Sequence, residues 1–97
     1  MIRSFRCADT QILFETGKTR HWAAILSVVE RKLGMLDAAV DLTDLRSPPG
    51  NRLEQLHGDR EGQHSIRING QYRICFVWGA NGPEHVEIVD ITEVSHV

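Results

Sequence analysis

Several side chains in the second half of the sequence suit acid–base and phosphate chemistry. They are His57, His64, Arg67, Arg73 and Asp90. Cleavage of RNA through its own 2′-hydroxyl needs a group that accepts the hydroxyl proton, cations that stabilise the pentavalent phosphate, and an acid for the departing 5′-oxygen. Arginine suits the phosphate because its planar fork donates two parallel hydrogen bonds, and histidine is an acid or base near neutral pH. By residue type alone, these side chains indicate a small domain with an anion site.

We expect no metal and no cofactor. The five histidines show no His-x-x-x-His spacing, and Cys7 and Cys75 form no Cys-x-x-Cys pair, so the usual patterns of metal ligands are missing. The glycines form no phosphate-cradling loop, and no serine or cysteine lies in a nucleophile motif. Two lone cysteines are typical of reduced thiols in a cytosolic protein, and packing is the expected role of Cys75.

A predicted hairpin fixes how the two central arginines face each other. Apolar side chains alternate with polar ones on both sides of the turn at Asn69–Gln71. A two-residue turn would mix the two faces, whereas a three-residue turn pairs Ile68 with Tyr72 and Ile66 with Ile74. Because the register must keep the apolar set together, the sequence predicts the three-residue turn.

In this register Arg67 lies directly opposite Arg73, on the face away from the apolar set. Like charges placed opposite each other destabilise a sheet unless something negative lies between or above them. Two interpretations remain open at this point. Either a carboxylate from a neighbouring strand neutralises the pair, or the arginines form a phosphate site.

Two helices are predicted before the hairpin. Asp9 is the expected N-cap of a brief helix over Thr10–Thr16, which ends at Gly17. An apolar stripe at spacings of three and four predicts a long core-facing helix over Arg20–Leu36, capped by Thr19. The charged run on that helix is expected toward solvent: Glu30, Arg31 and Lys32.

The remaining pattern is one of short strands and turns. Strands are predicted over Ile2–Arg6, Arg52–His57, Gln63–Ile68, Tyr72–Trp78 and His85–Ile91. Ninety-seven residues leave no room for two independent cores, so we expect one domain, residues 1–97. The order of elements predicts an α+β fold, with two N-terminal helices packed on one face of a curved, mainly antiparallel sheet and the other face open.

The charge pattern and the hydropathy limit the classes of partner that the protein can bind. A formal net charge of −2 argues against a general nucleic-acid-binding surface, so any such surface has to be local. No apolar stretch approaches the ~20 residues of a membrane helix, and Met1–Arg6 lacks the apolar core of a signal peptide. We therefore expect a cytoplasmic protein without membrane contact.

The sequence also resembles the HigB-like host-killing toxins of the RelE/ParE superfamily. The resemblance runs from Ile2 to Asp90, and no single run in it is decisive, but the order and spacing of the runs are specific. It is strongest in three runs: Gly58–Gln63, Ser65–Asn69 and Tyr72–Phe76. It implies a RelE-like fold and a toxin of a two-gene toxin–antitoxin module.

Such toxins enter the ribosomal A site and cut the mRNA being translated, so the resemblance implies a metal-independent endoribonuclease. It also implies a HigA-like helix-turn-helix antitoxin as partner, with operator DNA contacted only through that antitoxin. Arg73 and Asp90 match positions that the family uses at its active site. With His57, which replaces a usual lysine, they are the predicted catalytic residues. The predicted RNA-binding residues are Arg52, Arg60, His64 and Arg67.

The sequence departs from the family at two places. An upstream histidine frequent in the family is Glu54 here. Family members commonly finish Val-Asp-Tyr-His, and the last two residues contribute to catalysis, whereas this chain continues from Asp90 with Ile91–Val97. The departures imply a weakened or altered toxin. A further interpretation is that His96 folds back and takes the place of the missing terminal histidine.

Three functions are therefore open. The first is the ribosome-dependent endoribonuclease, which the facing arginines and Asp90 favour. The second is a catalytically weakened toxin that still binds its antitoxin and assists promoter repression, which the altered tail favours. The third is a ParE-like gyrase inhibitor, because one fold supports several functions, although no residue favours it.

Overall fold

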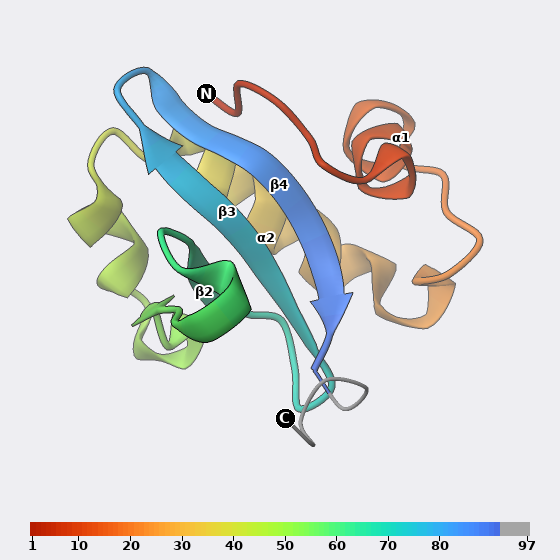
Figure 1. Ribbon diagram of the computed structural model, residues 1–97. Coiled ribbons are helices and arrows are strands. Elements are labelled where there is room, and N and C mark those ends of the chain that lie inside the picture. The colour runs from red at the N-terminus through yellow and green to blue at the C-terminus, as the bar shows by residue number, and fades with distance from the viewer. Residues whose placement is uncertain (92–97) are drawn as a thin grey trace.

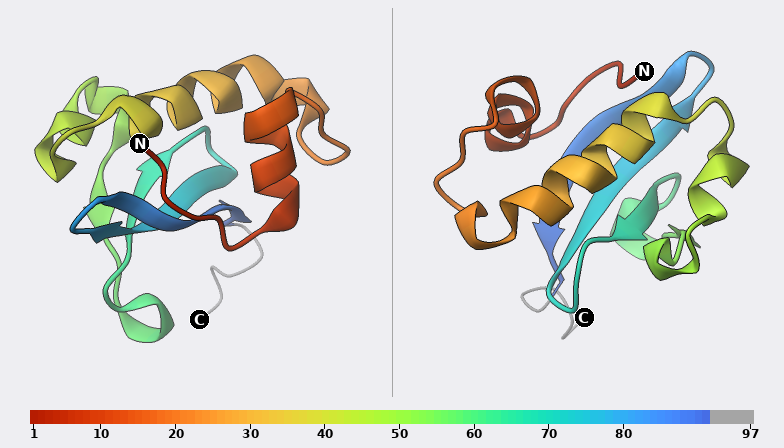
Figure 2. Two further views of the ribbon diagram at one scale, coloured as in Figure 1. Left: turned by 90° about the horizontal axis from the view of Figure 1, so that it is seen from above. Right: turned by 180° about the vertical axis from the view of Figure 1, so that it is seen from behind.

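A four-stranded antiparallel sheet with strand order β1-β2-β3-β4 organises the molecule. In the computed structural model, which describes residues 1–91, the strands are β1 (Glu54–Gln55), β2 (His64–Arg67), β3 (Tyr72–Gly79) and β4 (Gly82–Asp90). Helix α2 (Leu26–Ala38) crosses one face of the sheet, and α1 (Ala8–Thr16) lies beside β4 (Figures 1 and 2). The predicted α+β class with two helices before the sheet is confirmed.

The predicted hairpin register between β2 and β3 is also confirmed. Ile66 pairs with Ile74, and Arg67 pairs with Arg73. The turn between the strands is held by Asn69, whose side-chain oxygen accepts hydrogen bonds of 2.8 Å from the backbone amides of Gln71 and Tyr72. An asparagine that bonds the backbone in this way is a known turn former.

The hydrophobic core lies between α2 and the sheet. Every second residue of β2 and β3 contributes to it, and the helix contributes its apolar stripe. The fully buried members with 0% exposure include Val29, Leu33, Leu36, Ile66, Ile74 and Phe76. The predicted core-facing stripe of the long helix is therefore confirmed.

The starts of both helices differ from the sequence-based expectation. Helix α1 begins after Cys7, so Asp9 lies within the first turn and is not the N-cap, although Gly17 ends the helix in a left-handed conformation as expected. Helix α2 begins at Leu26, not at Arg20. The hydroxyl of Thr19 does accept two backbone hydrogen bonds as a cap would. Residues 20–22 are not helical, and Trp22 has a φ of −125° and a ψ of 26°, so no α-helix grows from that turn.

Lys32 does not point toward solvent as predicted. Its residue is only 6% exposed, and its ammonium donates a 2.5 Å hydrogen bond to the side-chain oxygen of Asn51. The Asn51 amide in turn donates to the carbonyls of Leu45 and Ser47. The long lysine stem packs under the helix, because the buried Asn51 amide oxygen accepts a hydrogen bond from the lysine ammonium.

The N-terminal segment is shorter as a strand than predicted. It runs along β4 (Figure 1), but it forms one parallel bridge, between Phe5 and Val86, and is not a continuous strand. β1 is likewise reduced to Glu54–Gln55, because Arg52 ahead of it adopts left-handed backbone angles. No helix within residues 1–91 is long and apolar enough to cross a membrane.

Candidate anion-binding and catalytic site

The sheet face turned away from α2 carries polar and charged side chains, and we call it the arginine face. Ser65 pairs with Cys75, Arg67 with Arg73, and Cys75 with Glu87. Because side chains alternate along a strand, these five residues share the face opposite the core. The short turn at Gly58–Arg60 lies on this side of the sheet (Figure 2, left).

Arg73 is fixed at the centre of the arginine face by several bonds at once. Its Nε donates to the Ser65 hydroxyl at 2.7 Å, and its Nη2 donates to the Arg52 carbonyl at 2.6 Å. The same Nη2 lies 3.3 Å from Glu54 Oε1, and the Arg73 side chain is only 11% exposed. Arg73 therefore joins β3 to β2 and to the segment that leads into β1.

The charge balance around Arg73 is positive. Burial lowers the pKa of Arg73 from its ordinary value, the Glu54 carboxylate acts against that shift, and the nearby charges of Arg67 and Arg52 add to it. The charges of Arg67 and Arg52 thus lie close enough to repel that of Arg73, with Glu54 as the carboxylate that pairs with Arg73. Within residues 1–91, Arg67 forms no ion pair. Such a cluster attracts an anion with several oxygens.

The first interpretation left open by the sequence holds for Arg73, and the phosphate site stays a prediction for Arg67. Glu54, from the neighbouring strand β1, pairs with Arg73. Arg67 and the exposed Arg52 are left as the cations of the cluster that no described carboxylate neutralises. Sequence reasoning missed Glu54 and Ser65 as site residues. Glu54 had a signal in the sequence, because it stands where the family frequently has a histidine, whereas Ser65 had none apart from the register that pairs it with Glu54.

Arg52 has an unusual backbone that the cluster stabilises. Its φ of 45° lies in the left-handed region, which a residue with a side chain adopts at a cost. Its carbonyl accepts the 2.6 Å hydrogen bond from Arg73. This bond holds the strained residue next to the other two arginines, so the fold places Arg52 in the cluster and does not leave it to a loose loop.

A second charged group on the arginine face is already neutralised. Arg60 Nη1 donates at 3.0 Å to both Gln63 and Glu87, and Arg6 Nε lies 3.7 Å from the same Glu87 carboxylate. Burial raises the pKa of the neighbouring Cys75 thiol. The predicted RNA-binding residue Arg60 therefore sits in an internal ion pair.

The other predicted site residues are not gathered around Arg73. Asp90 pairs with Tyr72 at the end of β4, so it alternates to the α2 side, where its carboxylate accepts a 2.9 Å bond from Gln71. His64 pairs with Phe76 on the core side and stacks on it, and its buried Nδ1 has no hydrogen-bond partner among residues 1–91. These two residues share the sheet with the arginines but face the opposite way.

His57 lies at the other end of the arginine face. The backbone amide of the preceding Leu56 bonds to the Gln63 carbonyl, which is four residues, ~13 Å of strand, from Arg67. The His57 side chain is 77% exposed, and its Nδ1 lies 4.0 Å from Glu61. His57 is therefore accessible but apart from the three-arginine cluster.

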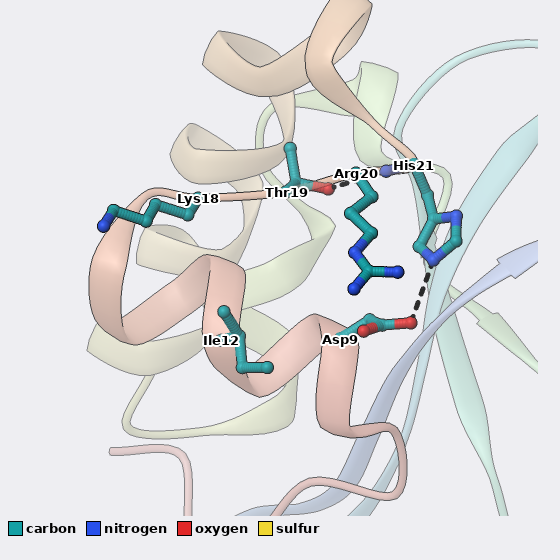
Figure 3. A pocket seen from close by; sticks show the side chains of 6 residues that line it. All are labelled: Asp9, Ile12, Lys18, Thr19, Arg20 and His21. Atoms are coloured by element: carbon teal, nitrogen blue, oxygen red, sulfur yellow. Dashed lines mark hydrogen bonds and ion pairs between the residues drawn. The ribbon is translucent and has the colours of Figure 1, made fainter.

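A separate pocket of about 390 Å³ lies between α1 and the segment leading to α2, and Figure 3 shows its lining: Asp9, Ile12, Lys18, Thr19, Arg20 and His21. A hydrogen bond of 3.0 Å between His21 Nε2 and Asp9 Oδ2 closes one side. The Thr19 hydroxyl holds the segment through the backbone amides of His21 and Trp22. No predicted site residue lines this pocket. Across the described residues, no three histidine, cysteine, aspartate or glutamate side chains gather to hold a metal ion.

The chain is similar over residues 3–92 to the family described as the RelE-like toxin of type II toxin-antitoxin system HigB. It is 52% identical to Toxin HigB-1 of Vibrio cholerae, over 58% of this chain and 59% of that protein. It is 42% identical to an uncharacterized protein of Haemophilus influenzae, over 59% of this chain and 56% of the relative. It is 32% identical to Endoribonuclease HigB of Proteus vulgaris, over 89% of this chain and 92% of that enzyme. The first two matches thus span little more than half of those relatives.

Proposed function

The chain belongs to the HigB-like family of RelE-like toxins, and from that premise we propose that it is an endoribonuclease that cuts mRNA during translation. The proposed reaction takes place in the ribosomal A site, in the cytoplasm, and needs no metal ion. A HigA-like helix-turn-helix antitoxin is the proposed partner that neutralises it, and operator DNA is reached only through this antitoxin. The similarity to Endoribonuclease HigB of Proteus vulgaris supports the reaction class.

The observation that carries the proposal is the three-arginine cluster of Arg52, Arg67 and Arg73. In the transition state of RNA cleavage, negative charge grows on the phosphate oxygens, and guanidinium groups already aimed at that position stabilise it. Arg73 is held rigidly by Ser65 and by the Arg52 carbonyl, so little reorganisation is needed when the phosphate arrives. Arg67 and Arg52 supply the cations that are free to bind it.

The size of the cluster supports a need for the ribosome. Three arginines on one short face, in a chain of net charge −2, offer few phosphate contacts, and the affinity for free nucleic acid grows with the number of such contacts. We therefore expect the ribosome to hold and orient the mRNA. His57 and Asp90 remain proposed catalytic residues, and Arg60 and His64 proposed RNA-binding residues. All four would need the bound mRNA to approach from more than one side of the sheet.

Induced expression followed by primer extension on cellular transcripts tests the proposal. We expect slowed growth together with new 5′ ends inside translated reading frames. Purified protein should leave naked RNA largely intact. Intact transcripts at growth-inhibiting levels of the protein would eliminate the nuclease.

A catalytically weakened toxin that acts mainly by binding its antitoxin is the second candidate. It is favoured by the residues after Asp90, where Ile91 and Thr92 stand in place of the family's Tyr-His. Ile91 is the last described residue, and Thr92–Val97 lie outside the described residues. An aromatic ring at this place stacks on a base with about 1–3 kcal/mol, and a proton donor contributes roughly a hundred- to ten-thousandfold in rate.

Ile91→Tyr combined with Thr92→His separates the two candidates. If the natural chain is a weakened enzyme, the double variant with the chain ended at residue 92 should cleave mRNA on stalled ribosomes at least ~100-fold faster, the lower bound of the proton-donor contribution alone. Equal single-turnover rates would mean that the natural residues cause no weakening. A faster natural chain would mean that Thr92, Glu93 or His96 performs the missing step.

A further inference from the structure

We propose that Glu54 is the general base of the cleavage reaction, an inference that rests on the proposed ribonuclease function. Glu54 belongs to the edge strand β1 and pairs with Ser65 of β2. Its Oε1 lies 3.3 Å from Arg73 Nη2, while its side chain is 59% exposed. The carboxylate is therefore fixed at one oxygen by the cluster and open to an incoming substrate hydroxyl.

The pairing of the strands explains why Glu54 reaches the right place. Arg73 extends from β3 across β2, where its Nε bonds to the Ser65 hydroxyl. Glu54 lies opposite Ser65 on the next strand, so the guanidinium and the carboxylate meet over the same rung of the sheet. A phosphate held by the arginines would then bring its neighbouring ribose against this carboxylate.

Other carboxylates on the sheet fit the role less well. Glu87 shares the arginine face, but its side chain is 16% exposed and is held by Arg60 and Arg6. Asp90 pairs with Tyr72 and so alternates to the α2 side. Among the strand residues that the structure describes on the arginine face, Glu54 is the carboxylate that combines exposure with contact to the three-arginine cluster.

The proposed step balances without a cofactor. Glu54 takes the proton of the ribose 2′-hydroxyl, and the 2′-oxygen forms a bond to phosphorus while the bond from phosphorus to the 5′-oxygen breaks. The products are a 2′,3′-cyclic phosphate and a 5′-hydroxyl, whose proton comes from solvent water. Arg52, Arg67 and Arg73 hold the phosphate oxygens as their charge grows.

Glu54→Gln tests the role because it removes the proton acceptor while keeping the size of the side chain. The Glu54 carboxylate in the pair with Arg73 is exposed, and an exposed ion pair contributes little to stability, so the melting temperature should stay close to that of the natural chain. Single-turnover cleavage of ribosome-bound mRNA should fall at least ~100-fold at saturating ribosome, with unchanged ribosome affinity. Glu15→Gln, an exposed position on α1, is the matched control and should cleave normally.

Glu54→His provides a readout that a structural role would not move. An imidazole can also accept the proton, so this variant should recover much of the rate at pH 7.5. Because an ordinary imidazole protonates near pH 6.5 and a carboxyl group only near 4.3, roughly, the recovered rate should fall as the pH drops through about 6.5. The natural chain should show no such fall.

The outcomes separate this inference from the proposed function. If the natural chain cleaves and Glu54→Gln cleaves equally fast at saturation, Glu54 is not the base. A Glu54→Gln variant whose defect is confined to weaker ribosome binding would exclude that role as well. If the natural chain itself cleaves no ribosome-bound mRNA, the proposed function fails, and the role of Glu54 fails with it.

Discussion

Two buried cations lie on opposite sides of the sheet and are held in opposite ways. Under α2, Lys32 is bonded to the neutral amide of Asn51, which uses its own donors on two backbone carbonyls. On the arginine face, Arg73 is bonded to Ser65 and the Arg52 carbonyl, contacts an exposed carboxylate and lies within the electrostatic influence of two other arginines. Lys32 links α2 to the segment of residues 47–51, whereas Arg73 lies at the centre of a charged surface.

The difference teaches how to tell a structural cation from a functional one. A buried charge is usually paired or hydrogen-bonded, because leaving it alone in the interior is expensive. Lys32 satisfies that need entirely inside the fold. Arg73 satisfies it too, but its arrangement gathers further positive charge at the surface, which a structural role does not require.

The largest effect on stability is expected from Asn51→Ala. Lys32 would lose its acceptor, and the carbonyls of Leu45 and Ser47 would lose their donor, so unfolding free energy should fall by about 3 kcal/mol or more. Chemical denaturation measures it, and cleavage per folded molecule should not change. Asn81→Ala at the exposed hairpin tip should stay within about 0.5 kcal/mol. A loss below ~1 kcal/mol for Asn51→Ala would show that the buried amide is not the fastening point.

A smaller loss of stability but a large loss of activity is expected from Arg73→Lys. A lysine ammonium lacks the planar fork that serves Ser65 and the Arg52 carbonyl together, so stability should fall by about 1–2 kcal/mol. Single-turnover cleavage should fall further than that loss of folded protein explains, because Arg52 is no longer held in place. Normal cleavage by the folded fraction would make Arg73 a purely structural residue, like Lys32.

The pH dependence of stability sharpens the comparison from the Lys32 side. Burial, and next the charge of Arg31, lower the pKa of Lys32 below its ordinary 10.5. Between its folded value and 10.5, the unfolded chain binds more protons, so the stability contribution of Lys32 rises with pH in that window. Cys75 acts oppositely, because burial raises its pKa above its ordinary 9.0. Above pH 9.0 the unfolded thiol loses its proton before the folded one, so this contribution makes stability fall as the pH rises.

The difference between the natural chain and Lys32→Met isolates the lysine, since Cys75 is common to both. Urea unfolding from pH 8 to 10.5 should show the natural chain gaining stability relative to Lys32→Met as the pH rises. A difference that stays flat over this range would contradict a Lys32 charge that is disfavoured by burial.

The sequence predicted the parts of the site that depend on periodicity. Alternation in the hairpin predicted that Arg67 lies opposite Arg73 on the face away from the core. The apolar stripe predicted which face of α2 packs against the core. Periodicity predicts only the face of the helix or strand on which a side chain lies. It could not predict that Lys32 would fold back to Asn51, or that Arg73 would reach across β2 to the Arg52 carbonyl, because both choices depend on partners distant in sequence.

The grouping of the site residues was harder still to predict. Asp90 and His64 were predicted as site residues together with the arginines, but alternation along β4 and β2 turns both toward α2. The pairing partner of β1 could not be read from the sequence, since only Glu54–Gln55 form the strand. The contact between Glu54 and Arg73 therefore emerges only when the register of that short strand is known.

Arg67→Ala tests most directly whether the arginine face binds the scissile phosphate. Arg67 has no ion-pair partner within residues 1–91, and removing a like charge opposite Arg73 should leave stability unchanged or raise it by a few tenths of a kcal/mol, roughly. A lost charge-assisted phosphate contact of about 1.5–3 kcal/mol corresponds to roughly a ten- to hundredfold slower single-turnover cleavage of ribosome-bound mRNA. Arg46→Ala, an exposed arginine away from the sheet, is the control and should cleave normally. A folded Arg67→Ala protein that cleaves as fast as the natural chain would contradict the account.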